Sequence, residues 1–137
     1  MRKIKLSVAL GSLLVLMSFV LMSFTQDKKP WDVPAKYQSM KNPQAADDAE
    51  MLKVGKMAYS RHCKSCHGNI GQGNGPKARS IEADLGDFTT AEFQAQKDGV
   101  IYYQSFVGRD EMPNFEKKII DDEDRWAIVT YLRTLKK

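Results

Sequence analysis

Cysteine and histidine are scarce in this sequence. Its 137 residues include two of each, and all four lie between positions 62 and 67. Two cysteines cannot form the disulfide framework that holds many small exported domains. A structural zinc site needs four ligands that surround the metal, and no second group of cysteines or histidines is present to supply them. The sequence therefore argues against a disulfide-rich scaffold and against a zinc fold.

Strand patterns are also missing. We find no alternating apolar and polar run typical of a strand and no internal repeat, whereas apolar residues recur at helical spacing in several segments. A helix is expected from Asp47 or Asp48 to about Arg61, with Gly55 on its apolar face. Because glycine is a poor helix former, Gly55 indicates close approach by another element. The sequence predicts an all-α domain.

Further helices are expected along the second half of the chain. They cover residues 77–85, a segment capped by Thr89 or Thr90, residues 99–107 capped by Asp98, and a last helix from Asp121 to about Leu135. Residues 26–46 hold three prolines and are interpreted as an arm or linker without a helix. The predicted organisation is thus 1–25 as a targeting or anchor segment, 26–46 as the arm, and 47–137 as the domain.

Net positive charge is nearly absent from the chain once its first residues are set aside. The formal charge is +4, but Arg2, Lys3 and Lys5 belong to the first 25 residues, which contain no acid. Without them, 18 Lys and Arg remain against 17 Asp and Glu, a formal charge of +1. Nucleic-acid binding, which a pI near 9.0 would suggest, therefore has no support in the remaining chain.

One long hydrophobic run follows these basic residues, from Leu6 to Phe24. Its length and flanking charge are typical of an export signal or an N-terminal membrane anchor, and the cleavage pattern at Ser23-Phe24-Thr25 is too poor to separate the two. No cysteine lies near the end of this run, so attachment of a lipid to a cysteine there is excluded. In either form the basic end stays inside, so we expect the domain on the periplasmic side of the cytoplasmic membrane.

The chemistry of the chain is concentrated in Cys63-Lys64-Ser65-Cys66-His67. Cys-x-x-Cys-His is the attachment signature of a c-type haem, since two thiols at this spacing reach two vinyl groups and the next residue then lies under the iron. A thioredoxin-like site would need a βαβ context, and a plain disulfide leaves His67 unexplained. The interpretation is one covalent haem c with His67 as proximal iron ligand.

The second axial position is open to a His, a Lys, a Met or no residue. His62 is too close to the attachment site to reach the opposite face, and the methionines at 40, 51 and 57 precede it. Met112 lies in an irregular stretch directly before Pro113, well after the motif. A Met ligand would raise the reduction potential relative to a second His. We therefore predict Met112 as the distal ligand.

Together these stretches resemble the class I mono-haem cytochromes c of bacterial periplasms. The resemblance rests on Gly55 to Gly68, Gly73 to Pro76, Gly108 to Phe115, and Asp121 to Leu135. It implies a bundle of four to five short helices around one haem, with the first and last helices crossing at Gly55, Tyr59, Ile128 and Tyr131. It also implies that the Pro76 carbonyl accepts the Nδ1 hydrogen of His67.

The expected function is single-electron transfer in a respiratory chain rather than enzyme catalysis. A haem ligated by His67 and Met112 has no open site for substrate. Expected partners are a quinol-oxidising complex or dehydrogenase and a terminal oxidase, with Lys64, Lys77 and Arg79 at the docking edge. Two alternatives stay open: a haem subunit fixed in a membrane oxidoreductase complex, and a peroxidase-like or ligand-binding haem protein.

Overall fold

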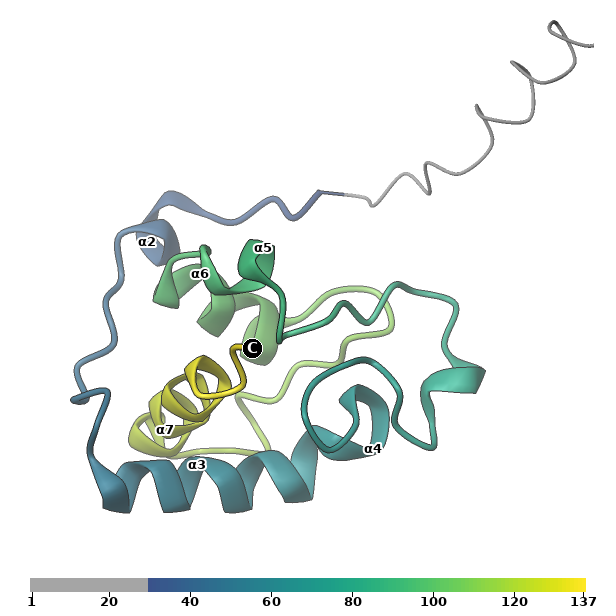
Figure 1. The fold of residues 1–137 in the computed structure, drawn as a ribbon. Coiled ribbons are helices and arrows are strands. Elements are labelled where there is room, and N and C mark those ends of the chain that lie inside the picture. Colours follow the sequence, from purple (N-terminus) through teal and green to yellow (C-terminus); the bar gives the residue numbers. More distant parts are fainter. Residues whose placement is uncertain (1–29) are drawn as a thin grey trace, which may run out of the picture. The chain divides into compact units, whose positions relative to one another are not determined.

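Helices and the loops between them make up residues 30–137, the part of the chain that the computed structural model describes (Figure 1). In chain order they are α2 (Ala35–Gln38), α3 (Ala49–His62), α4 (Lys64–His67), the 3-10 turn η1 (Ala78–Ser80), α5 (Ala91–Gln94), α6 (Asp98–Tyr102), the π-helical turn η2 (Tyr103–Val107) and α7 (Asp122–Arg133). No strand occurs in these residues, so the all-α prediction is confirmed. The run from Leu6 to Phe24 lies outside them, and among the described helices none is long and apolar enough to cross a membrane.

The two long helices, α3 and α7, come into backbone contact at Gly55. A Cβ atom at this position would overlap the carbonyl oxygen of Ala127 and lie 3.0 Å from the Cβ of Tyr131. The rings of Tyr59 and Tyr131 pack beside the contact, with centroids 5.3 Å apart. The close approach predicted from the mid-helix glycine is present, and Ala127, one residue before the expected Ile128, makes it.

The core lies where α3, α6, η2 and α7 meet. Its buried members are Tyr59, Ile101, Tyr102, Phe106, Ile119, Trp126, Ile128, Val129 and Leu132. The Tyr102 ring is central, with centroids 4.5 Å from Trp126 and 4.9 Å from Phe106. Edge-to-face and tilted aromatic pairs of this kind add to the stabilisation that burial itself provides.

Side-chain caps fix the starts of three helices, as predicted. Asp48 accepts hydrogen bonds from the backbone of Glu50 and Met51, Thr90 caps α5, and Asp121 caps α7. Asp98 is the exception, because it is the first residue of α6 rather than its cap. Its carboxylate pairs with Arg133 at 2.6 Å, so a tertiary ion pair takes the oxygen that a cap would use.

Two short elements also differ from expectation. The helix predicted over 77–85 is reduced to the single turn η1, because the backbone becomes extended at Ile81. The helix expected to run to Val107 changes at Tyr103 into the π-helical turn η2, where the amide of Gly108 bonds to the carbonyl of Tyr103 at 3.2 Å. Gly108 then ends it with φ of +72°, the positive value that favours glycine.

The expectation of an arm without a helix is wrong for the described residues. Residues 35–38 form α2, and residues 31–137 belong to one compact unit. Tyr37 stacks on Tyr102, and its carbonyl lies where a Cβ of Gly99 would be. Further along, the Asn42 side chain donates to the Thr130 hydroxyl at 2.8 Å. Proline content did not reveal these contacts, because they are made with residues far along the chain.

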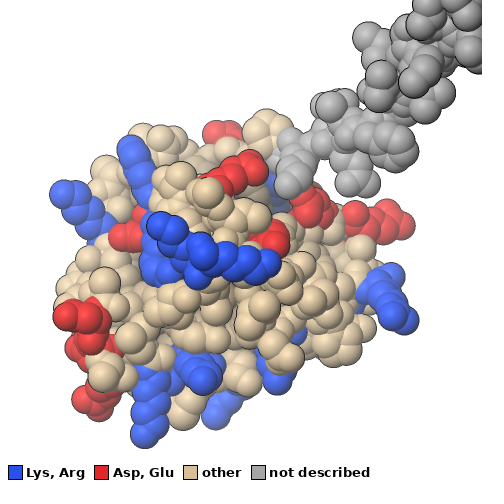
Figure 2. Space-filling view, viewed as in Figure 1, with Lys and Arg blue, Asp and Glu red and all other residues tan. Residues whose placement is uncertain are grey.

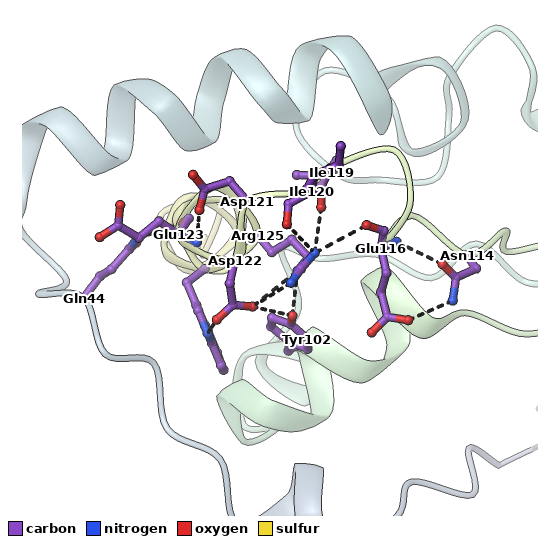
Figure 3. Close-up of polar contacts among 11 residues, drawn as sticks. Gln44, Tyr102, Asn114, Glu116, Ile119, Ile120, Asp121, Asp122, Glu123 and Arg125 are labelled. Atoms are coloured by element: carbon purple, nitrogen blue, oxygen red, sulfur yellow. Dashed lines mark hydrogen bonds and ion pairs between the residues drawn. The ribbon is translucent and has the colours of Figure 1, made fainter.

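Arg125 holds the loop that precedes α7 (Figure 3). One guanidinium nitrogen donates to the carbonyls of Ile119 at 2.7 Å and Ile120 at 3.2 Å. The other nitrogens reach the Tyr102 hydroxyl at 2.6 Å and the Asp122 carboxylate at 3.0 Å. A single side chain thus joins α6, α7 and the loop between them, which continues the Met112 segment.

Candidate functional site

The Cys-x-x-Cys-His stretch forms one tight helical turn at the end of α3. Cys63 is both the C-cap of α3 and the N-cap of α4. Its amide donates to the Tyr59 carbonyl at 2.9 Å. The Cys63 carbonyl then accepts from the amides of Cys66 at 3.2 Å and His67 at 3.0 Å. Both thiols are partly buried, and they are not joined in a disulfide. Burial, with a smaller contribution from Cys66, raises the pKa of the Cys63 thiol to about 12.

His67 is buried, with 7% of its surface exposed, and neither ring nitrogen has a hydrogen-bond partner. Burial lowers its pKa, and a contact with the Leu85 backbone, which does not reach hydrogen-bond geometry, partly offsets this effect. The ring therefore favours the neutral form, which is the form that ligates metals. Buried polar atoms normally have partners, because an unpaired one costs about 1–3 kcal/mol. A nitrogen aimed at a metal is relieved of that cost.

The glycine-rich stretch after His67 is fastened to the motif by backbone hydrogen bonds. Gly73 donates to the His67 carbonyl at 2.9 Å and Gly75 to the Cys66 carbonyl at 3.0 Å. A Cβ at Gly75 would lie 2.7 Å from that same Cys66 oxygen, so only glycine fits. The expected hydrogen bond from His67 to the Pro76 carbonyl is not made here. The role of Pro76 in orienting His67 stays a prediction.

Met112 sits at the end of a closed four-residue turn. Arg109 and Met112 form an antiparallel bridge in which each amide bonds to the other's carbonyl, at 2.9 and 2.8 Å. Asp110 has φ of +46°, and Gly108 lies against the Met112 carbonyl so closely that a Cβ would overlap it. The Glu111 carboxylate accepts from the Ala83 amide at 2.6 Å. These contacts fix the backbone of the Met112 turn.

Phe115, shortly after this turn, connects it to the attachment motif. Its amide bonds to the Phe106 carbonyl at 2.8 Å, and its ring packs edge-on to His62 at 6.2 Å. His62 directly precedes Cys63, so the two halves of the predicted site lie together, and Met112 is near His67. Sequence reasoning had linked these stretches through the choice of Met112 as distal ligand and through the family resemblance.

Three contacts of the site were missed from the sequence. The Tyr59 hydroxyl donates to the carbonyl of Gly68, and its pKa is raised, mainly by burial. Phe88 stacks on His67 at 4.6 Å, and the Glu111 carboxylate ties the Met112 turn to Ala83. No local signal marks these partners, because each pair is brought together only by folding.

The residues present fit a covalently bound haem. Two thiols flank one helical turn, a buried neutral imidazole follows with both nitrogens unpaired, and a thioether lies on a separate fixed turn. A thioether and an imidazole are soft and borderline ligands suited to iron in haem.

Comparison with known proteins agrees with this fit. No curated protein matched the chain. The family model for cytochrome c matches residues 52–136, from the first turn of α3 to Lys136, beyond α7. The protein therefore belongs to the cytochrome c family, with one haem c attached through Cys63 and Cys66.

Proposed function

We propose that this protein is a single-electron carrier whose haem iron is ligated by His67 and Met112. The observation that carries the proposal is the buried imidazole of His67, unpaired at both nitrogens, together with the closed turn that presents Met112. The bound haem supplies a one-electron couple between ferric and ferrous iron. The protein supplies two axial ligands on rigid backbone, which suits transfer with little rearrangement.

The Met112 turn favours electron transfer over binding of a small substrate. It is held by the Arg109 bridge, by the Glu111 carboxylate and by the Phe115 amide, so its backbone is restrained on both sides. A ligand held this way keeps the distal position filled. The chain's two histidines are both committed to the motif region, which leaves none as a distal acid–base group.

The direct test is an optical spectrum of the protein in both oxidation states, together with its intact mass. The expected result is a c-type reduced spectrum, a weak far-red band from a methionine–iron bond when oxidised, and a mass increase of one haem. A high-spin oxidised spectrum would overturn the carrier proposal in favour of a ligand-binding haem protein. The same mass tells whether residues 1–25 are retained.

We further propose that the protein works on the periplasmic side, between a quinol-oxidising complex or dehydrogenase and a terminal oxidase. Lys64, Lys77 and Arg79 are exposed beside the attachment turn and form the proposed docking edge. On the face drawn in Figure 2, basic and acidic side chains are interspersed, so steering by net charge is modest. The rate of electron transfer to a partner should fall with added salt, and a salt-independent rate would remove this edge from the proposal.

The same activity is compatible with a fixed place in a membrane oxidoreductase complex. Mild detergent extraction distinguishes the two arrangements. A free carrier is released alone, whereas a subunit co-purifies with other redox proteins in constant proportion. The second result would replace the carrier by the subunit assignment without changing the iron ligands.

A further inference from the structure

Trp31, the first residue of the compact unit, contacts the turn that carries Met112. The guanidinium carbon of Arg109 lies 3.9 Å from the centre of the Trp31 ring. The same ring meets Tyr103 edge-on, with centroids 6.3 Å apart. Trp31 is half-buried and is not a member of the core cluster. A cation this close to an indole face is attracted by the ring quadrupole.

These two contacts lie at the two ends of one structural unit. Tyr103 is the first residue of η2, and the Gly108 amide closes that turn on the Tyr103 carbonyl. Arg109 follows directly and forms the bridge with Met112. Trp31 therefore contacts both the first residue of η2 and the residue paired with Met112. Π-helical turns are uncommon and are found often at functional sites.

We propose that Trp31 is a positioning residue that holds the Met112 turn closed through Arg109. The inference rests on the proposed ligation by Met112. By fixing the guanidinium, Trp31 restricts the Arg109 backbone, and the Arg109–Met112 bridge passes this restriction to the ligand. Trp31 lies outside residues 52–136, so this contact with Arg109 is made by a residue that precedes the matched domain. Losing a cation–π contact of ordinary strength should increase opening of the turn about 3- to 30-fold.

The arm, residues 26–46, also provides a control, because a second residue of it contacts the domain away from Arg109. The Gln44 side chain donates to the Glu123 carbonyl at 2.9 Å, at the start of α7 and away from the Met112 turn. The Gln44 side chain also accepts from the Thr130 hydroxyl at 3.4 Å, so Gln44→Ala removes two arm contacts with α7 without touching Arg109. If Trp31 merely fastens the arm, Trp31→Ala and Gln44→Ala should act alike. If Trp31 positions the turn, they should differ.

The experiment uses the full haem-containing protein and imidazole as the probe. Imidazole binds ferric iron only when the methionine ligand has left, so its binding constant reports turn opening, and it is followed as loss of the far-red methionine–iron band. Trp31→Ala should bind imidazole about 3- to 30-fold more tightly than wild type. Trp31→Phe should restore part of the difference, and Gln44→Ala should stay within about twofold. Equal binding by Trp31→Ala and wild type would overturn the proposal.

Amide hydrogen exchange gives a second readout that does not depend on added ligand. The amides of Arg109 and Met112 are protected by the bridge, and Trp31→Ala should expose them while the core amides of α7 keep their protection. Uniform loss of protection would indicate a merely structural role and contradict the proposal. Arg109→Gln should reproduce the effect of Trp31→Ala, and the double variant should add little.

Failure of this inference is distinguishable from failure of the proposed ligation. If the wild-type protein shows no methionine–iron band, Met112 is not the ligand and both proposals fail. If the band is present and Trp31→Ala leaves imidazole binding and exchange unchanged, only the role of Trp31 is lost.

Discussion

The hydroxyl of Tyr59 donates a 2.7 Å hydrogen bond to the carbonyl of Gly68. Tyr59 belongs to α3 and is 2% exposed, while Gly68 directly follows His67 and ends α4 with φ of +81°. The bond spans the Cys-x-x-Cys-His turn from the helix before it to the residue after it. The orientation of His67 therefore depends on a residue one helical turn before the motif.

Removing this bond should destabilise the protein without detaching the haem. Tyr59→Phe keeps the ring but leaves the Gly68 carbonyl unpaired, which costs about 1–3 kcal/mol in a buried position. Urea unfolding followed by circular dichroism measures the change. Tyr131→Phe is the matched control, because the Tyr131 ring packs against Tyr59 on the other side of the helix crossing. Both substitutions keep the ring, so a loss in Tyr131→Phe as large as that in Tyr59→Phe would mean that removing any hydroxyl at this crossing has the same effect and that the bond to Gly68 is not special.

Gly55→Ala tests the contact between α3 and α7. Alanine is a better helix former than glycine by about 1 kcal/mol, so an unopposed substitution would stabilise α3. Here the new Cβ overlaps the Ala127 carbonyl, and overpacking of this kind costs about 1–3 kcal/mol. We expect a net decrease in melting temperature, measured by calorimetry. Ser60→Ala, at an exposed position of the same helix, should leave it almost unchanged. A stabilised Gly55→Ala variant would contradict the close approach.

Met112→Ala tests the distal ligand. The haem should stay attached through Cys63 and Cys66, while the far-red band disappears and the reduction potential falls. Axial ligands tune haem potentials over a range of about 0.8 V, so the fall should be readily measured by spectroelectrochemical titration. Met57→Ala, which alters a methionine that is 57% exposed on α3, should change neither property. An unchanged spectrum in Met112→Ala would assign the distal position to another residue.

Acid should weaken the Asp122 network. Partial burial by itself raises the pKa of Asp122, but hydrogen bonds from Tyr102 and Arg125 outweigh it and hold the pKa below the usual carboxyl value. Because the folded pKa lies below the unfolded one, this contribution is complete above pH about 4 and is lost as the pH falls through the folded value.

Asp122→Asn should therefore lose stability at neutral pH and show a flatter decline between neutral pH and pH about 3. Urea unfolding at a series of pH values measures both effects. Glu123→Gln removes one negative charge from the same helical turn without touching Tyr102 or Arg125, and its curve should run parallel to that of wild type. Parallel curves for Asp122→Asn and wild type would show that the network does not contribute.

Local sequence signals gave the starts of the long helices and the attachment turn. Asp48, Thr90 and Asp121 cap helices where predicted, because a short polar side chain can reach only the amides two or three residues ahead. The same local logic places Cys63, Cys66 and His67 on one turn. Spacing along the chain decides such features, so they need no knowledge of the rest of the fold.

Predictions from local sequence were wrong at residues whose partners lie far along the chain. Asp98 looked like a cap, but Arg133, far along the chain, takes its carboxylate. Prolines suggested an arm or linker without a helix, yet α2 forms there, Val33 is buried, and Tyr37 and Asn42 contact the helices. In each case a partner distant in sequence offers a better interaction than the local one.

The sequence by itself determined that this protein is all-α, that it carries haem at Cys63 and Cys66, and that Met112 follows in a loop before Pro113. These properties are encoded in spacing and residue type. Only the tertiary structure decided that Tyr59 spans the haem turn, that Phe88 stacks on His67, and that Trp31 lies over Arg109. The reason is physical. Hydrogen bonds and ring contacts between distant residues form only when folding has overcome the loss of conformational entropy, and no local sequence pattern indicates which distant residues will be in contact.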